Sequence, residues 1–169
     1  GGRWEPKRKG WGAMCDGAVT LNDPVLGLGA ALFQDGVEIA CLVQNFELKA
    51  KKSQHLAVLI AEYKAKNELL KALLALVQNK HIPNNITVEI AQDSLVAVNQ
   101  VKGEFHINDD VLLALREEDR QLQTQLLREE VKIENIWTPR DNLKRADELA
   151  KEAKKSSSNR GFFWHNNTM

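Results

Sequence analysis

WGAMCDGAVTLNDPVLGLGAALFQDGVEIACLVQNF, residues 11 to 46, holds the pattern that decides the fold. Three apolar runs with strand character follow one another here, at 11–20, 27–34 and 37–46. The tripeptide QDG at 34–36 predicts a tight turn between the second and third runs, as in an antiparallel hairpin. These residues therefore predict a meander of three antiparallel strands.

Helices and further strands are predicted after the meander. Ser53 is a good N-cap residue, and the apolar spacing that follows it predicts a helix to about Asn79. The segment 108–130 predicts a second long helix with Asn108 as its cap. The remaining predicted elements are strands at 86–92 and 131–137 and helices at 94–101 and 140–155. Strands that alternate with long helices after an opening meander indicate an α/β fold with a mixed sheet.

The composition is that of an ordinary globular chain. Its 169 residues carry 23 basic and 23 acidic side chains, and the net charge of +0 therefore identifies no partner. No stretch has the ~20 apolar residues that are needed to cross a bilayer, so we expect no membrane contact. Cys15 and Cys41 lack metal-ligand spacing, which predicts buried free thiols in a reducing intracellular compartment, cytoplasm or nucleus. We expect a flexible basic lead at 1–10, one domain at 11–155 and a tail at 156–169.

Four acidic side chains come from four separate predicted elements. They are Asp16 inside the first strand, Glu62 near the apolar side of the long helix, Asp93 after the fourth strand and Asp147 in the last helix. An acid at a strand end often only caps the next helix, and Asp93 has that alternative. Carboxylates that converge at one edge of a sheet repel one another, and hard cations such as Mg²⁺ let them stay ionised together. The four acids therefore predict a magnesium site.

Five short motifs resemble, in their order along the chain, motifs of the type 1 ribonuclease H family. They are CDGA at 15–18, GLGAALF at 27–33, AEYKA at 61–65, QDSLVAVNQVKGEF at 92–105 and PRDNLKRADELAKEA at 139–153. The similarity is closest to the compact branch found in archaeal, bacterial and plant reverse-transcriptase-like proteins, and it covers roughly residues 12 to 155. The resemblance implies a ribonuclease H-like fold, a five-stranded mixed sheet with its first three strands antiparallel and helices on its flanks.

The resemblance also implies an activity, the endonucleolytic hydrolysis of the RNA strand of RNA/DNA hybrids. The family uses two metal ions per site, Mg²⁺ or Mn²⁺ as a substitute, to activate the attacking water and stabilise the leaving oxygen. The implied catalytic residues and metal ligands are Asp16, Glu62, Asp93 and Asp147. The implied contacts to nucleic acid are Gly17, Asn22, Ser94 and Asn99. Gly17 would let the substrate backbone approach, whereas the three polar residues have turn or cap roles as an alternative.

Several residues depart from the family pattern. Trp137 stands where many members carry a histidine before the last helix, and Leu95 stands where a glutamine is usual. His165 would replace the histidine only if the tail folds back over the site, and we expect it to have no role. A second family spacing puts the glutamate at the position of Val58, but the AEYKA match favours Glu62. The two positions lie one turn apart on one helix row, so both point the same way.

These departures leave more than one function open. We expect either a free enzyme or a domain of a reverse-transcribing polyprotein beside a reverse transcriptase domain, with the oligomeric state undetermined. The alternative is a non-catalytic ribonuclease-H-like module of a larger nucleoprotein assembly. A nuclease or resolvase for DNA structures is a third hypothesis, which the motifs VNQVKGEF and ADELA disfavour.

Overall fold

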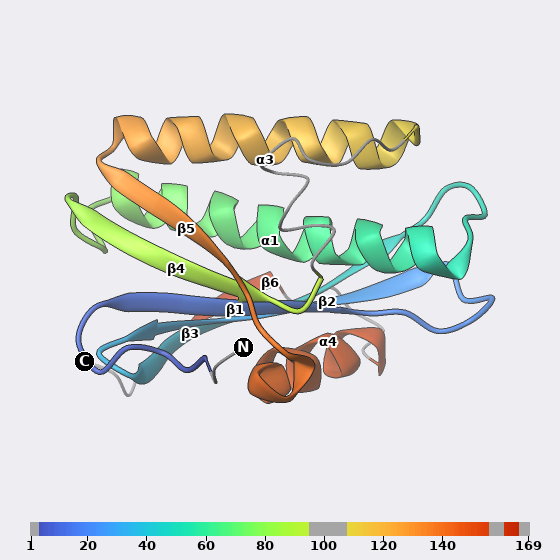
Figure 1. Cartoon of the computed structure of the whole chain (residues 1–169), viewed down its shortest axis with the longest axis horizontal. Coiled ribbons are helices and arrows are strands. Elements are labelled where there is room, and N and C mark those ends of the chain that lie inside the picture. The colour runs from blue at the N-terminus through green and yellow to red at the C-terminus, as the bar shows by residue number, and fades with distance from the viewer. Residues whose placement is uncertain (1–3, 95–107, 156–160, 166–169) are drawn as a thin grey trace.

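One mixed sheet of six strands lies between two layers of helices in the residues that the structure describes, 4–94, 108–155 and 161–165. In this computed structural model the strands are β1 (Trp11–Ala18), β2 (Val25–Gln34), β3 (Val37–Glu47), β4 (Ile86–Gln92), β5 (Val131–Trp137) and β6 (Gly161–Trp164). The helices are α1 (Gln54–Gln78), α3 (Asp110–Arg128) and α4 (Lys144–Lys155), which follows the 3-10 turn η1 (Arg140–Leu143). Figure 1 shows α1 and α3 on one face of the sheet and α4 on the other.

The strand order is β5-β4-β1-β2-β3-β6, with β1, β2 and β3 antiparallel and β4 parallel to both β1 and β5. This arrangement confirms the predicted α/β class and the predicted meander. The prediction of five strands is wrong, because Gly161–Trp164 adds β6 to the free edge of β3. The sequence predicts a tail here, because so short a strand has no signal of its own and forms only where a neighbouring edge supplies its hydrogen bonds.

Local signals set the ends of the elements. Asp35 and Gly36 both have positive φ, 52° and 81°, as the tight β2–β3 hairpin requires. Ser53 caps α1, because its side chain accepts a hydrogen bond from the backbone N–H of Leu56 at 3.2 Å. The predicted cap of α3 at position 108 is wrong by one residue. The cap is Asp109, whose side chain accepts a hydrogen bond from the backbone N–H of Leu112 at 3.0 Å. Of the predicted helix at 94–101, residues 95–101 lie outside the described residues.

Two glycines of β2 let α4 lie directly on the sheet. A Cβ atom at Gly27 or Gly29 would collide with the backbone carbonyls of Ala150 and Ala146 in α4. A strand residue with any side chain would therefore push the helix away. The consequence is that the first turn of α4 lies close to the sheet near the end of β1.

A buried ion pair joins α1 to α3. Lys66 Nζ lies 3.0 Å from Asp119 Oδ2, and both side chains are fully buried. Two charges withdrawn from water are stable only as a pair, so this contact fixes how the two helices pack. None of the helices in the described parts of the chain is long and apolar enough to cross a membrane.

Candidate active site

Three of the predicted acids meet at one end of the sheet. Asp16 comes from β1, Asp93 directly follows the neighbouring parallel strand β4, and Glu62 comes from α1, which packs across β1. One carboxylate oxygen from each of the three lies within 4.8 Å of the others. Asp16 and Glu62 are each only 2% exposed, and Asp93 is half-buried. We call these three residues the acidic cluster.

The acidic cluster has hydrogen bonds on one side only. The backbone N–H of Gly17 donates to Asp16 Oδ1 at 2.9 Å and to Glu62 Oε1 at 3.3 Å. The second oxygens, Asp16 Oδ2 and Glu62 Oε2, are buried and have no hydrogen-bond partner among the described residues. A buried carboxylate oxygen without a partner is costly. Two such oxygens in neighbouring carboxylates suit a hard divalent cation, whose preferred ligands are oxygens.

Burial and mutual repulsion oppose ionisation of the acidic cluster. Burial, followed by the charge of Asp93, raises the pKa of Asp16 to about 6. Burial raises the pKa of Glu62 well above its ordinary value, with the charge of Asp16 as the next cause. Burial also raises the pKa of Asp93. A bound divalent cation would reverse these shifts, because an opposite charge favours the ionised form.

Asp147 lies at the wall of the same pocket and not within the acidic cluster. Its oxygens are held by Lys151 Nζ at 2.9 Å and by Arg140 Nη2 at 3.4 Å. Although burial acts the other way, these two cations lower the pKa of Asp147. The structure therefore brings together three of the four predicted ligands and leaves the fourth beside them in ion pairs. Lys151 was missed as a pocket residue, yet its i,i+4 spacing from Asp147 was a readable signal.

The acidic cluster opens onto a pocket of about 570 Å³ between β1, α1 and α4. Arg140 faces this pocket, and the charge of Asp16 is the largest of the causes that raise the pKa of its guanidinium. The lysines on the α4 side of the pocket are Lys151, Lys154 and Lys155. A pocket with carboxylates on one side and lysines on the other suits a phosphate backbone. The phosphates would lie against the lysines, and divalent cations would lie between the phosphates and the acidic cluster.

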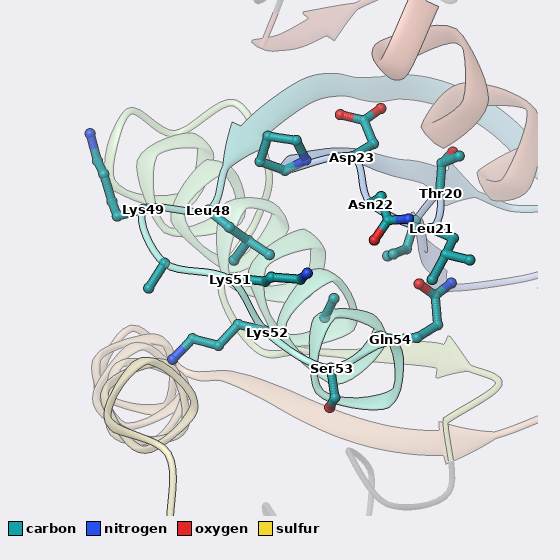
Figure 2. Close-up of a pocket in the computed structure, with 14 residues that line it drawn as sticks. Thr20, Leu21, Asn22, Asp23, Leu48, Lys49, Lys51, Lys52, Ser53 and Gln54 are labelled. Atoms are coloured by element: carbon teal, nitrogen blue, oxygen red, sulfur yellow. The ribbon is translucent and has the colours of Figure 1, made fainter.

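A second hollow of about 750 Å³ continues from the first between the β1–β2 loop and the segment that leads into α1. Figure 2 shows Lys51 reaching across this hollow toward Asn22 of the β1–β2 loop. Lys52 instead pairs with Asp109 of α3 at 2.7 Å. The residues that line both hollows are Val19, Thr20 and Gln54. The two hollows therefore form one track that leads away from the acidic cluster.

The four residues predicted to contact nucleic acid have different positions. Gly17 lines the pocket, but a Cβ there would collide with Ala61 of α1. Helix packing thus gives this glycine a structural reason, and its expected role in the approach of the substrate stays a prediction. Asn22 is exposed in the second hollow, with φ of 63°, and Ser94 is half-buried next to Asp93. Asn99 lies outside the described residues.

The structure also shows the contacts of three residues that bear on the departures from the family pattern, Trp137, Val58 and His165. Trp137 is 43% exposed at the end of β5, and its Nε1–H donates to the backbone carbonyl of Asp93 at 3.1 Å. Val58 lines the pocket with an apolar side chain, one turn from Glu62. His165 lies beside Glu38 of β3, 2.7 Å away, and does not reach the acidic cluster. The indole N–H of Trp137 thus holds the backbone that carries Asp93.

Comparison with known proteins finds similarity in structure but not in sequence families. No family model and no curated protein matches the sequence. RNase H1 from the halophilic archaeon Halobacterium salinarum NRC-1 is similar in structure, with 27% identity, a TM-score of 0.66, and coverage of 85% of this chain and 96% of that one. LC11-RNase H1 in complex with an RNA/DNA hybrid has 19% identity, a TM-score of 0.68, and coverage of 84% and 94%.

A third similar structure is the N-terminal RNase H domain of a Mycobacterium tuberculosis protein. It has 21% identity and a TM-score of 0.62, and the match covers 86% of this chain and 93% of that one. All three matches cover most of both chains, with TM-scores of 0.62 to 0.68. The fold of this chain therefore points to the ribonuclease H family.

Proposed function

We propose that the protein is an endoribonuclease that hydrolyses the RNA strand of RNA/DNA hybrids at the acidic cluster. The observation that carries this proposal is that Asp16, Glu62 and Asp93 each bring a carboxylate oxygen within 4.8 Å of the others, while Asp16 Oδ2 and Glu62 Oε2 are buried without a hydrogen-bond partner among the described residues. Similarity to RNase H1 structures, one of them bound to an RNA/DNA hybrid, supports the choice of substrate. Ribonuclease H enzymes fold as this chain does, although fold alone does not determine a reaction.

Divalent cations are the cofactors that this donor set fits. Asp16, Glu62 and Asp93 would hold Mg²⁺, or Mn²⁺ in its place, through carboxylate oxygens. Bound as a pair, such ions supply activation of the attacking water and stabilisation of the leaving oxygen. Asp147 would take part after its contacts with Lys151 and Arg140 loosen, since it lines the same pocket.

The residues around the acidic cluster have separate tasks in this proposal. The backbone N–H of Gly17 orients Asp16 and Glu62 through one oxygen of each. Lys155 of the α4 wall and Lys51 of the second hollow bind the phosphate backbone, whereas Lys151 and Lys154 are paired with Asp147 and Asp23. Ser94 and Asn22 would contact sugar hydroxyls, which distinguish RNA from DNA.

A cleavage assay tests the proposal directly. Hybrid with a labelled RNA strand is incubated with the protein and Mg²⁺ or Mn²⁺, beside duplex DNA and duplex RNA as control substrates. We expect cleavage of the hybrid RNA strand, loss of that cleavage in Asp93→Asn, and normal cleavage in Asp141→Asn, which changes an exposed aspartate outside the pocket. Absence of cleavage with either metal would favour the non-catalytic module. Equal cleavage by Asp93→Asn would contradict the site.

A further inference from the structure

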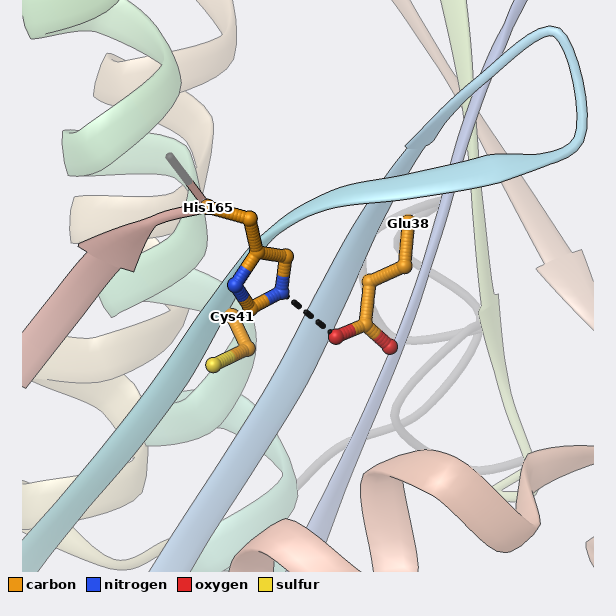
Figure 3. Close-up of side chains that lie close together, drawn as sticks. All are labelled: Glu38, Cys41 and His165. Atoms are coloured by element: carbon orange, nitrogen blue, oxygen red, sulfur yellow. Dashed lines mark hydrogen bonds and ion pairs between the residues drawn. The ribbon is translucent and has the colours of Figure 1, made fainter. Parts of the chain in front are cut away.

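A second group of metal-binding side chains lies on the β3–β6 edge of the sheet, away from the acidic cluster. Glu38 and Cys41 come from β3, and His165 directly follows β6. One ligand atom from each lies within 4.8 Å of the others. Figure 3 shows the imidazole of His165 close to both the Glu38 carboxylate and the Cys41 side chain. We call these three residues the edge cluster.

A β-bulge places Glu38 and Cys41 on the same face of β3. Leu32 of β2 pairs with Ala40, but the next residue of β2 pairs with Glu38, so Ile39 is inserted without a partner. Ile39 and Ala40 both pack toward α1, whereas Cys41 packs toward α4. In a regular strand, residues three apart point to opposite faces. The bulge therefore turns Glu38 toward the α4 face, where Cys41 already lies.

Strand pairing brings His165 to that same face. Phe163 of β6 lies opposite Cys41, and the backbone N–H of His165 donates to the carbonyl of Ile39 at 2.9 Å. His165 is two residues beyond Phe163, so it shares the face of Phe163 and of Cys41. Its Nε2 lies 2.7 Å from Glu38 Oε2. The three donors converge only because β6 is paired with β3.

We propose that the edge cluster is a zinc site that fastens β6 to β3. Thiolate, imidazole and carboxylate are the ligand types of zinc, and three protein ligands leave one position for water. In a tetrahedral zinc site, bonds of about 2.0 to 2.3 Å separate the ligand atoms by about 3.3 to 3.8 Å. The widest pairs, up to 4.8 Å apart, reach that geometry by moving inward by about 1 Å, and the Nε2 atom of His165 moves apart from Glu38 Oε2, now 2.7 Å away; side-chain rotation supplies both shifts.

The charges in and around the edge cluster determine its affinity for a cation. Arg145 of α4 donates to Glu38 from Nε at 2.8 Å and from Nη2 at 3.1 Å, and it orients the carboxylate as outer partners of metal ligands do. Its positive charge lowers the affinity for a cation. The Cys41 thiol releases one proton on binding, and zinc with the Glu38 carboxylate and the thiolate then sums to zero charge. The side chains of Glu38 and His165 are 20% and 27% exposed, which gives the ion a path inward.

Cobalt is a suitable spectroscopic probe, because a Co²⁺–thiolate bond gives a charge-transfer absorption band that carboxylate ligands do not give. The full chain is freed of metal with a chelator and titrated with Co²⁺ in excess Mg²⁺, which occupies the acidic cluster. We expect a thiolate band at one equivalent of Co²⁺ that bleaches when Zn²⁺ is added. A protein that shows no thiolate band at saturating Co²⁺ overturns the proposal without any variant.

Variants identify the ligands. We expect Cys41→Ala to abolish the band, and His165→Ala to weaken Co²⁺ binding by more than about 10-fold, since even outer partners of a metal site contribute about 10-fold to 100-fold. The matched controls are Cys15→Ala, at the other buried cysteine, and His55→Ala, at an exposed histidine. Both controls should keep the band. A band that survives Cys41→Ala, or that disappears in Cys15→Ala alone, contradicts the assignment.

Discussion

The substitution Asp16→Asn is expected to stabilise the protein when no divalent ion is bound. In the folded chain burial and the charge of Asp93 raise the pKa of Asp16 from 3.8 to about 6. A carboxyl whose pKa rises on folding makes the fold more stable when protonated, so stability falls as pH rises from about 4 to about 6. Near neutral pH the ionised Asp16 costs about 3 kcal/mol, at 1.36 kcal/mol for each pKa unit.

Asparagine removes that charge and keeps the local contacts. Its side-chain oxygen can still accept the hydrogen bond from the Gly17 N–H. Its amide N–H₂ offers a donor to the buried Oε2 of Glu62, which has no partner among the described residues. For a domain of this size, 3 kcal/mol corresponds to a rise in melting temperature of about 6 to 12 °C.

Urea unfolding in chelator, followed by circular dichroism, measures this difference. Near pH 7 the free energy of unfolding should rise in Asp16→Asn, and near pH 5 the gain should fall to about half, because the native carboxyl is then largely protonated. With Mg²⁺ the unmodified protein should gain stability and the variant should not, so the gap closes. The surface control Asp141→Asn should match the unmodified protein throughout. If Asp16→Asn is no more stable than the unmodified protein in chelator, burial and the charge of Asp93 do not disfavour the ionised Asp16, and the metal assignment loses its basis.

Three further predictions concern packing and binding. Lys66→Met should lose about 3 to 5 kcal/mol of stability in urea unfolding, because Asp119 then stays buried without its partner. The double variant Lys66→Met, Asp119→Leu should recover most of that loss. A single variant as stable as the unmodified protein would contradict the buried pair. Gly17→Ala should cost about 1 to 3 kcal/mol through its clash with Ala61. Ala61→Gly in the same chain should restore part of that loss, because it removes the Cβ contact and leaves the contact with the Ala61 carbonyl carbon at 2.9 Å; no rescue at all would place the strain elsewhere. Lys155→Ala should lower the slope of log hybrid affinity against log salt by about 1 without changing base preference, and an unchanged slope would remove Lys155 from the phosphate contacts.

Much of the fold was readable from the sequence because its signals are local. Alternating apolar residues indicate the strands, the QDG turn predicts the β2–β3 hairpin, and Ser53 predicts the start of α1. The strand β6 was not readable, since its four residues depend on the unpaired edge of β3. The bulge at Ile39 has no signature of its own and appears only through pairing with β2. Buried Lys66 was equally hidden, because a polar residue in a helix pattern reads as a solvated position.

The acidic cluster was predictable in part. Glu62 stood out as an acid near an apolar helix face, and Asp16 and Asp93 lay on strands that the topology makes neighbours. Asp147 was placed with them by resemblance, and its ion pairs with Lys151 and Arg140 became visible only in three dimensions. The tail histidine, His165, was expected to have no role, because sequence separation conceals its contact with Glu38.

The central claim is that Glu62 shares metal ions with Asp16 and Asp93 for hydrolysis of a hybrid. Single-turnover cleavage of a labelled RNA/DNA hybrid with Mg²⁺, compared between the unmodified protein and Glu62→Gln, tests it most directly. Glu68→Gln is the matched control, because Glu68 is also in α1 but contacts Gln44 and Lys71. We predict that Glu62→Gln loses orders of magnitude in rate, while Glu68→Gln keeps the rate of the unmodified protein. Equal rates for Glu62→Gln and the unmodified protein would contradict the account.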